Sequence, residues 1–208
     1  MDNTNKRLIL GAVLFEGFEL LDIYGPLEMF GILVMLKSNV EIIMIGEKIG
    51  PVKSAAGPCG YIDKSFLEIE DVDILLIPGG IGTRTEINNR KLINSLKELS
   101  NKASYVATIC TGSALLAKTE LLNGIKATSN KMAFHWVTEQ GPKVKWIHKA
   151  RWVEDGKFFT SSGVSAGMDM TLGLIEKIYG KDKSLKVANL AEYEWHQDKS
   201  CDPFYKTN

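Results

Sequence analysis

The chain has 208 residues, of which 45% are hydrophobic, and this is enough for one domain with one sizeable core. Lys plus Arg total 25 and Asp plus Glu total 25, so the formal net charge is zero. Such a balance provides no overall field to attract nucleic acid or an anionic membrane. We therefore expect a single domain over residues 1–208 that binds neither.

The cysteines and the N-terminal segment indicate the compartment. Cys59, Cys110 and Cys201 cannot all pair, and their spacing resembles no disulfide framework or zinc site. The first apolar run is too short for a signal peptide, and no apolar run approaches the roughly 18 residues of a membrane span. These features predict a cytoplasmic protein with free thiols, without a metal or another cofactor.

Continuous apolar runs predict four strands, at residues 8–15, 40–45, 73–80 and 105–109. Runs of this kind are typical of parallel strands that are buried on both faces. Residues 50–62 are rich in glycine and proline, which favours an irregular excursion or a small hairpin.

Helical patterns alternate with these strands. Proline suits the first position of a helix, so one helix is predicted to begin at Gly25-Pro26. Asp155-Gly156 lies between two apolar arms and predicts a hairpin over residues 151–161. The remaining helices are expected at residues 89–101, 111–118, 130–140 with Asn130 as its cap, 165–179 and 183–197. Alternating strands and helices predict an α/β fold with a mainly parallel sheet.

Residues 106–118, VATICTGSALLAK, place a cysteine where a predicted strand meets a helix. If the helix begins at Thr111 or Gly112, its free backbone N–H groups and positive dipole end face the Cys110 sulfur, which predicts a lowered pKa for this thiol. The small residues that follow allow the sharp turn of a nucleophile elbow, with cysteine in the place of serine. The alternative interpretation is a buried cysteine that packs as a small hydrophobic side chain.

Asp22 and the motif IPGG, residues 77–80, are expected at the same edge of the sheet. Asp22 lies among apolar residues after the first strand, and a carboxylate in such surroundings needs a partner or a raised pKa. The alternative is a solvated loop aspartate. The glycines Gly79 and Gly80 follow another strand and let backbone N–H groups face a developing negative charge.

The cysteine elbow, Asp22 and the IPGG motif together resemble the ThiJ/PfpI superfamily, over roughly residues 8–195. That resemblance implies a flavodoxin-like three-layer sandwich, related to class I glutamine amidotransferases, with a cysteine nucleophile elbow. One branch is especially similar, the isonitrile hydratase-like subfamily. The segments that carry this similarity are LLDIYGPLEMF, LLIPGGIGTR, ICTGSALLAKTELLNG, ATSNKMAFHW and SSGVSAGMDM.

The resemblance implies a site and a reaction. Cys110 is expected to be the nucleophile and Asp22 its acid partner, with Gly79, Gly80 and Thr111 binding the substrate or orienting a polar intermediate. The implied substrate is a small molecule, an isonitrile. The implied reaction hydrates it to an N-substituted formamide through a thioimidate intermediate. A homodimer is also implied.

Two departures weigh against other branches of the superfamily. Those branches place a histidine after the cysteine and a glutamate at the acid position, whereas this chain has Thr111 and Asp22. The glyoxalase or deglycase activity on 2-oxoaldehydes therefore stands as an alternative, and the peptidase-like activity is disfavoured. A second alternative is a sensor, since the fold also resembles the N-terminal domain of some AraC-type regulators and a reactive cysteine oxidises readily.

Three further groups could assist at the site. His135 lies mid-helix, where packing or surface exposure is the favoured interpretation over catalysis. Asp169 is expected to make a structural polar contact. The tryptophans Trp136, Trp146 and Trp152 are assigned to the core or to a dimer contact.

Overall fold

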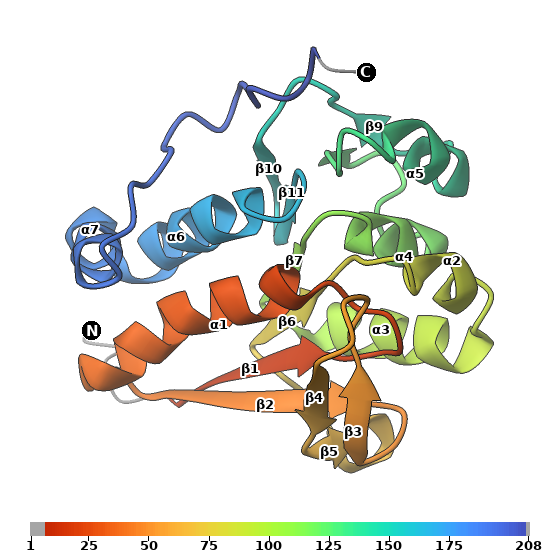
Figure 1. Cartoon of the computed structure of the whole chain (residues 1–208), viewed down its shortest axis with the longest axis horizontal. Coiled ribbons are helices and arrows are strands. Elements are labelled where there is room, and N and C mark those ends of the chain that lie inside the picture. The colour runs from red at the N-terminus through yellow and green to blue at the C-terminus, as the bar shows by residue number, and fades with distance from the viewer. Residues whose placement is uncertain (1–6, 207–208) are drawn as a thin grey trace.

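A seven-stranded sheet forms the centre of the computed structural model, which describes residues 7–206 (Figure 1). The strands lie in the order β10-β11-β7-β6-β1-β2-β5, and only the pairing of β10 with β11 is antiparallel. The strands are β1 Leu8–Val13, β2 Val40–Gly46, β5 Lys64–Ser65, β6 Ile74–Ile77, β7 Tyr105–Thr108, β10 Trp152–Asp155 and β11 Phe158–Ser161. This arrangement confirms the predicted α/β fold.

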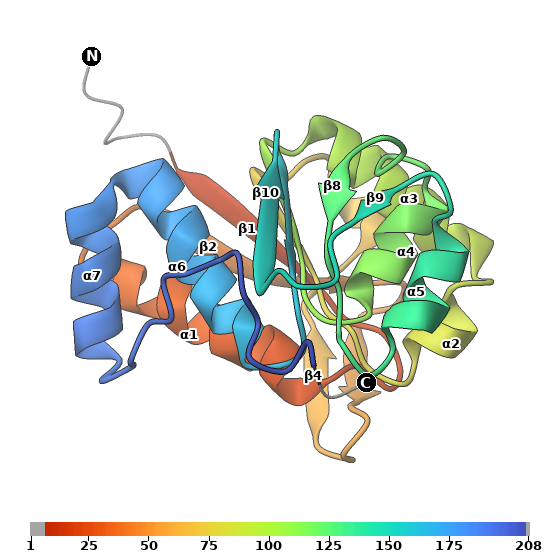
Figure 2. The same cartoon turned by 90° about the horizontal axis from the view of Figure 1, so that it is seen from above.

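Helices cover both faces of the sheet, as Figure 2 shows from above. The helices α1 Leu20–Met35, α6 Ala166–Tyr179 and α7 Lys181–Leu190 cover one face. The helices α2 Thr83–Glu86, α3 Arg90–Lys102, α4 Gly112–Lys118 and α5 Phe134–Gln140 lie on the other side. The three layers explain why the central strands carry apolar residues on both faces; all four residues of β6 are buried.

Short elements complete the fold. The glycine- and proline-rich excursion forms the antiparallel hairpin of β3 Gly50–Lys53 and β4 Cys59–Ile62, followed by one 3-10 turn, Phe66–Glu68. A second small sheet pairs β8 Lys126–Ala127 with β9 Lys145–Trp146. The hairpin predicted at Asp155-Gly156 is also present, with Gly156 at a φ of 60°.

The first helix begins earlier than the proline predicts. It starts at Leu20, so Pro26 lies in its interior. Proline there removes the backbone hydrogen bond to the carbonyl of Asp22. Burial of apolar side chains such as Met29 and Phe30 against the sheet offsets that loss. Packing therefore overrides the local signal, and Asp22 belongs to the first turn of a helix rather than to a loop.

Two later helices also differ from their predicted ranges. Asn130 does accept a hydrogen bond from the Ala133 N–H at 2.9 Å, but α5 begins only at Phe134. The last helix, predicted to reach residue 197, ends at Leu190, and Glu192 has a left-handed φ of 49°. The chain then runs as an irregular tail back toward α5 (Figure 1).

Candidate active site

Three neighbouring strands bring the candidate residues to one edge of the sheet. The strands β7, β6 and β1 are adjacent and parallel, so their carboxyl ends lie together. Cys110 follows β7, Gly79 follows β6, and Asp22 follows β1 within the first turn of α1. Ligands bind at this edge in open α/β sheets.

Cys110 has the strained backbone of a nucleophile elbow. Its φ of 53° is left-handed, which costs on the order of 1–3 kcal/mol for a residue other than glycine. The turn is tight because a Cβ at Gly112 would lie only 2.5 Å from the Ile77 carbonyl oxygen. Glycine at that position lets α4 begin directly against the end of β6.

Three serines hold the strained turn through the backbone of Cys110. The Cys110 N–H donates to the Ser162 carbonyl at 3.1 Å. The hydroxyls of Ser113 and Ser129 donate to the Cys110 carbonyl at 3.1 Å and 2.8 Å. Ser113 belongs to the turn itself, whereas Ser129 and Ser162 come from distant segments, and sequence spacing does not signal the contacts of those two.

Asp22 is fully buried beside the elbow. Its Oδ2 accepts a hydrogen bond from the Gly79 N–H at 2.8 Å, whereas Oδ1 has no hydrogen-bond partner among the described residues. Burial raises the pKa of the Asp22 carboxyl to about 8; the Gly79 N–H lowers it and the charge of Glu19 adds to the rise. The side chain is therefore a carboxylic acid at neutral pH, with one oxygen available to donate a proton. The burial excludes the solvated-loop alternative, and the role of Asp22 as the acid stays a prediction.

Gly79 forms the link between the acid and the thiol. A Cβ at this position would lie 2.9 Å from the Cβ of Cys110 and 2.6 Å from the Thr111 nitrogen. Only glycine lets β6 end so close to the elbow, and the same residue donates to Asp22.

The two glycine N–H groups are not free donors, which corrects the sequence-based expectation for Gly79 and Gly80. The Gly79 N–H donates to Asp22, and the Gly80 N–H donates to Thr111 Oγ1 at 3.1 Å. The Thr111 hydroxyl donates to the Gly80 carbonyl at 3.3 Å. Hydrogen bonding from Thr111 and Val164 lowers the pKa of the Cys110 thiol, so these residues could stabilise negative charge at the reacting centre.

The pKa of Cys110 moves opposite to the predicted direction. The side chain is only 7% exposed, and burial, with the charge of Asp22 as a second cause, raises the pKa of the Cys110 thiol to about 12. Hydrogen bonds from Thr111 and Val164 lower it only in part. A helix of seven residues does not offset that desolvation, so the resting pair at neutral pH is a thiol beside a carboxylic acid.

The other sequence candidates lie away from this pair or serve the fold. The His135 side chain is 92% exposed, 3.3 Å from Glu139, which agrees with a surface role. Asp169 is buried and forms an ion pair with Arg151 at 2.5 Å, which confirms a structural contact. Trp152 is buried in the core.

Within residues 7–206, which the structure describes, there is no group of three His, Cys, Asp or Glu side chains that could hold a metal ion. No helix of the same range is long and apolar enough to span a membrane.

Comparisons with known proteins agree with this geometry. The model of the DJ-1/PfpI family matches residues 9–177. Isonitrile hydratase of Pseudomonas putida is 29% identical over 187 residues, covering 89% of this chain and 78% of the relative. A deglycase of Pyrococcus abyssi is 28% identical over 158 residues, covering 75% of this chain and 89% of the relative. The crystal structure of a ThiJ/PfpI family protein from Pseudomonas syringae has a TM-score of 0.81 and 25% identity, covering 93% of this chain and 80% of that one.

Proposed function

Because this chain belongs to the DJ-1/PfpI family, we propose that it is a cysteine-dependent hydro-lyase, one that hydrates an isonitrile to an N-substituted formamide. The observation that carries the proposal is the buried pair of a protonated Asp22 and the Cys110 thiol at a strained elbow. The similarity to isonitrile hydratase over most of the chain supports the reaction type.

The first step adds the thiol to the terminal carbon of the isonitrile. The Cys110 sulfur forms the new C–S bond while Asp22 donates its proton to that carbon, and the thiol proton replaces the one that Asp22 has given. The product is a thioimidate, R–N=CH–S–Cys110. Sulfur and hydrogen both end on the same carbon, so a proton donor is needed beside the nucleophile.

The second step hydrolyses the thioimidate. Water attacks its carbon and the nitrogen gains a proton, which gives R–NH–CH(OH)–S–Cys110. When the C–S bond breaks, the thiol recovers its proton and the formamide R–NH–CHO leaves. Hydrogen bonding from Thr111 and Val164, which lowers the pKa of the Cys110 thiol, stabilises the charge that the sulfur carries as it departs.

An activity on 2-oxoaldehydes is the second candidate, because a deglycase is among the relatives. The two reactions make different demands on the acid. Addition to an isonitrile requires a proton on carbon, whereas addition of a thiol to a carbonyl requires one on oxygen. Isonitrile hydration and activity on 2-oxoaldehydes can both be tested on the same protein preparations.

A direct test compares formamide production from cyclohexyl isocyanide with consumption of methylglyoxal. We expect wild type to release N-cyclohexylformamide and Cys110→Ala to release none. Cys59→Ala is the matched control, because Cys59 is exposed and has no role in the proposed chemistry, so this variant should retain activity. Turnover of methylglyoxal without any hydration would overturn the proposal in favour of the second candidate.

A further inference from the structure

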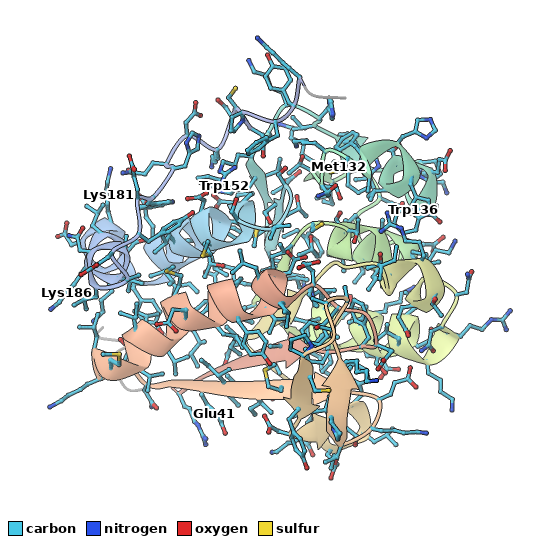
Figure 3. All side chains as sticks on the ribbon, viewed as in Figure 1. Glu41, Met132, Trp136, Trp152, Lys181 and Lys186 are labelled. Carbon is cyan, nitrogen blue, oxygen red and sulfur yellow. The ribbon has the colours of Figure 1, made fainter. Side chains whose placement is uncertain are left out.

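Lys131, between β8 and α5, is a buried lysine that the proposed mechanism does not use. It is only 5% exposed, although lysine is almost never buried in proteins unless its charge is satisfied. The neighbouring Met132, labelled in Figure 3, is 88% exposed, so the chain turns the lysine inward where it passes close to the surface. A buried ammonium at such a place calls for an explanation.

The three donors of the Lys131 ammonium all find oxygen acceptors. Nζ donates to the Ala150 carbonyl at 2.6 Å, to Thr128 Oγ1 at 3.0 Å and to the Ser129 carbonyl at 3.3 Å. Burial lowers the pKa of this ammonium to about 8, and the charge of Asp202 limits that fall. At pH 7 the ammonium is therefore mostly charged, and it ties residues 128 and 129 to the segment that precedes β10.

Ser129 connects this ammonium to the cysteine elbow. Its hydroxyl donates to the Cys110 carbonyl at 2.8 Å, and both residues are buried. The Ser113 hydroxyl donates to the same oxygen at 3.1 Å, so the two serines fill both lone pairs of this carbonyl. Ser113 belongs to α4, which begins at the elbow itself, whereas Ser129 is 19 residues away from Cys110 in the chain. Of the two serines, Ser129 is the one that ties the carbonyl to a segment outside the turn.

The side chain of Asn130 contacts the segment on the other side of the Cys110 backbone. A Cβ at Gly163 would lie only 2.4 Å from Asn130 Nδ2, so the amide packs directly against this glycine. Gly163 follows Ser162, whose carbonyl accepts from the Cys110 N–H at 3.1 Å. Residues 129 and 130 therefore contact the elbow and the segment that holds its N–H.

We propose that Lys131 is a positioning residue, which fixes residues 128–130 so that the Ser129 hydroxyl holds the Cys110 carbonyl and keeps the strained elbow in place. Cys110 has a left-handed φ of 53°, and a residue other than glycine keeps such a backbone only where the surrounding contacts over-determine it. Lys131 acts on the thiol through Ser129 and does not need to touch substrate. Its catalytic relevance rests on the proposed function, but its effect on the accessibility of the thiol does not.

Removing the ammonium should loosen the elbow. Lys131→Met keeps a long unbranched side chain but leaves three oxygen acceptors without their shared donor. Residues 128–130 are then no longer fixed, and the Ser129 hydroxyl leaves the Cys110 carbonyl part of the time. The Cys110 thiol, which is 7% exposed in the intact fold, opens to solvent more often. Loss of one hydrogen bond corresponds to roughly a tenfold change in that opening equilibrium.

The experiment measures labelling of Cys110 by methyl methanethiolsulfonate at pH 7 in a Cys59→Ser, Cys201→Ser background. The thiolate attacks the reagent, forms a mixed disulfide with its methylthio group and releases methanesulfinate, and intact mass follows the product. We expect Lys131→Met and Ser129→Ala each to speed labelling about tenfold. The double variant should be no faster than either single variant, because both changes act through the same contact.

Lys157→Met is the matched control. The Lys157 ammonium likewise donates to three backbone carbonyls, those of Ser100, Asn101 and Ala103 at 2.5 Å, 3.2 Å and 3.2 Å, but they lie at the C-terminal end of α3. This variant should leave the labelling rate unchanged. Low urea concentrations should not change the rate in Lys131→Met either, because local loosening exposes far less surface than global unfolding does.

Equal labelling rates in Lys131→Met and the parent would overturn the inference, as would additive effects in the double variant or equal acceleration by Lys157→Met. If Lys131→Met does not fold, Lys131→Gln decides, because its amide has two donors for three acceptors and should also speed labelling. An unchanged rate in that variant would then overturn the inference.

Activity provides a second measurement. With an isonitrile substrate, kcat should fall in Lys131→Met while KM is unchanged, because the thiol is less well aligned with the acid. Labelling needs no substrate. A protein that hydrates no isonitrile but shows the expected labelling rates would refute the proposed function and leave the positioning role intact.

Discussion

At the residue scale, Asp22 determines how the proposed reaction depends on pH. Replacing the carboxyl by an amide in Asp22→Asn retains its size but removes the proton that must reach carbon. Loss of general acid–base help costs about 10²- to 10⁴-fold in rate. We expect kcat for isonitrile hydration to fall by that factor, measured as formamide release, with circular dichroism to confirm folding.

The wild-type enzyme should itself lose activity as the pH rises through about 8, because Asp22 must be protonated to act and its pKa is about 8. The residual activity of Asp22→Asn should lack this falling limb. If folded Asp22→Asn hydrates isonitrile at the wild-type rate, another group near the thiol must be the acid.

The same carboxyl makes the stability of the fold depend on pH. Its pKa is 3.8 in the absence of burial and about 8 in the folded chain. Between these values the unfolded chain has already released the proton that the folded chain retains, so the free energy of unfolding falls as the pH rises. The slope approaches about 1.4 kcal/mol per pH unit within the window.

Asp22→Asn cannot ionise and should lose that slope. We expect the free energy of unfolding of the variant, relative to wild type, to increase from pH 5 to pH 8 and then to level off. Urea denaturation at each pH measures it. Parallel stability curves for the two proteins would mean that Asp22 is not buried as an acid.

At the scale of elements, the irregular tail after α7 is tied to the core by Asp169. This carboxylate accepts hydrogen bonds from the Tyr193 hydroxyl at 3.1 Å and the His196 N–H at 2.9 Å, in addition to its ion pair with Arg151. Arg151 also lies 3.6 Å from Asp202 of the tail. These contacts hold the tail against the core after the helix ends at Leu190.

Breaking this anchor should destabilise the protein. Asp169→Ala leaves the buried Arg151 without its main partner, and such a loss typically costs about 3–5 kcal/mol. We expect a decrease of that size in the free energy of unfolding by urea, together with faster proteolysis after α7. Glu194→Ala, at an exposed position of the tail, is the matched control and should leave both unchanged.

At the scale of the whole molecule, the homodimer implied by the family resemblance remains a prediction. Several large apolar side chains are exposed on the single chain, including Leu67 at 97% and Met132 at 88%, and a partner surface would remove such groups from water. Light scattering should yield about twice the 23.0 kDa chain mass. A monomer at micromolar concentration would contradict the expectation.

The sequence alone was sufficient to predict the fold class, and it singled out Cys110 and Asp22 as the candidate pair. Continuous apolar runs that alternate with helical patterns are typical of a parallel sheet covered by helices on both faces. The strands β1, β6 and β7 all lie where those runs predict them. Cys110 stands out because it breaks an apolar run directly after β7, and Asp22 because it is a carboxylate among apolar residues in the first turn of α1. Their positions in the chain, with the parallel sheet, place them at one edge.

Only the tertiary structure decided the chemistry of that pair. The direction in which the pKa of a thiol shifts depends on how completely the surrounding atoms exclude water. The atoms that bury Cys110 come from segments far apart in the chain. The same holds for the Gly79 and Gly80 N–H groups, whose acceptors lie on α1 and at the elbow. The hydrogen bond between the Thr83 and Thr111 hydroxyls, at 3.1 Å, is likewise invisible in sequence, because hydrogen bonds between distant segments follow from packing and not from local spacing.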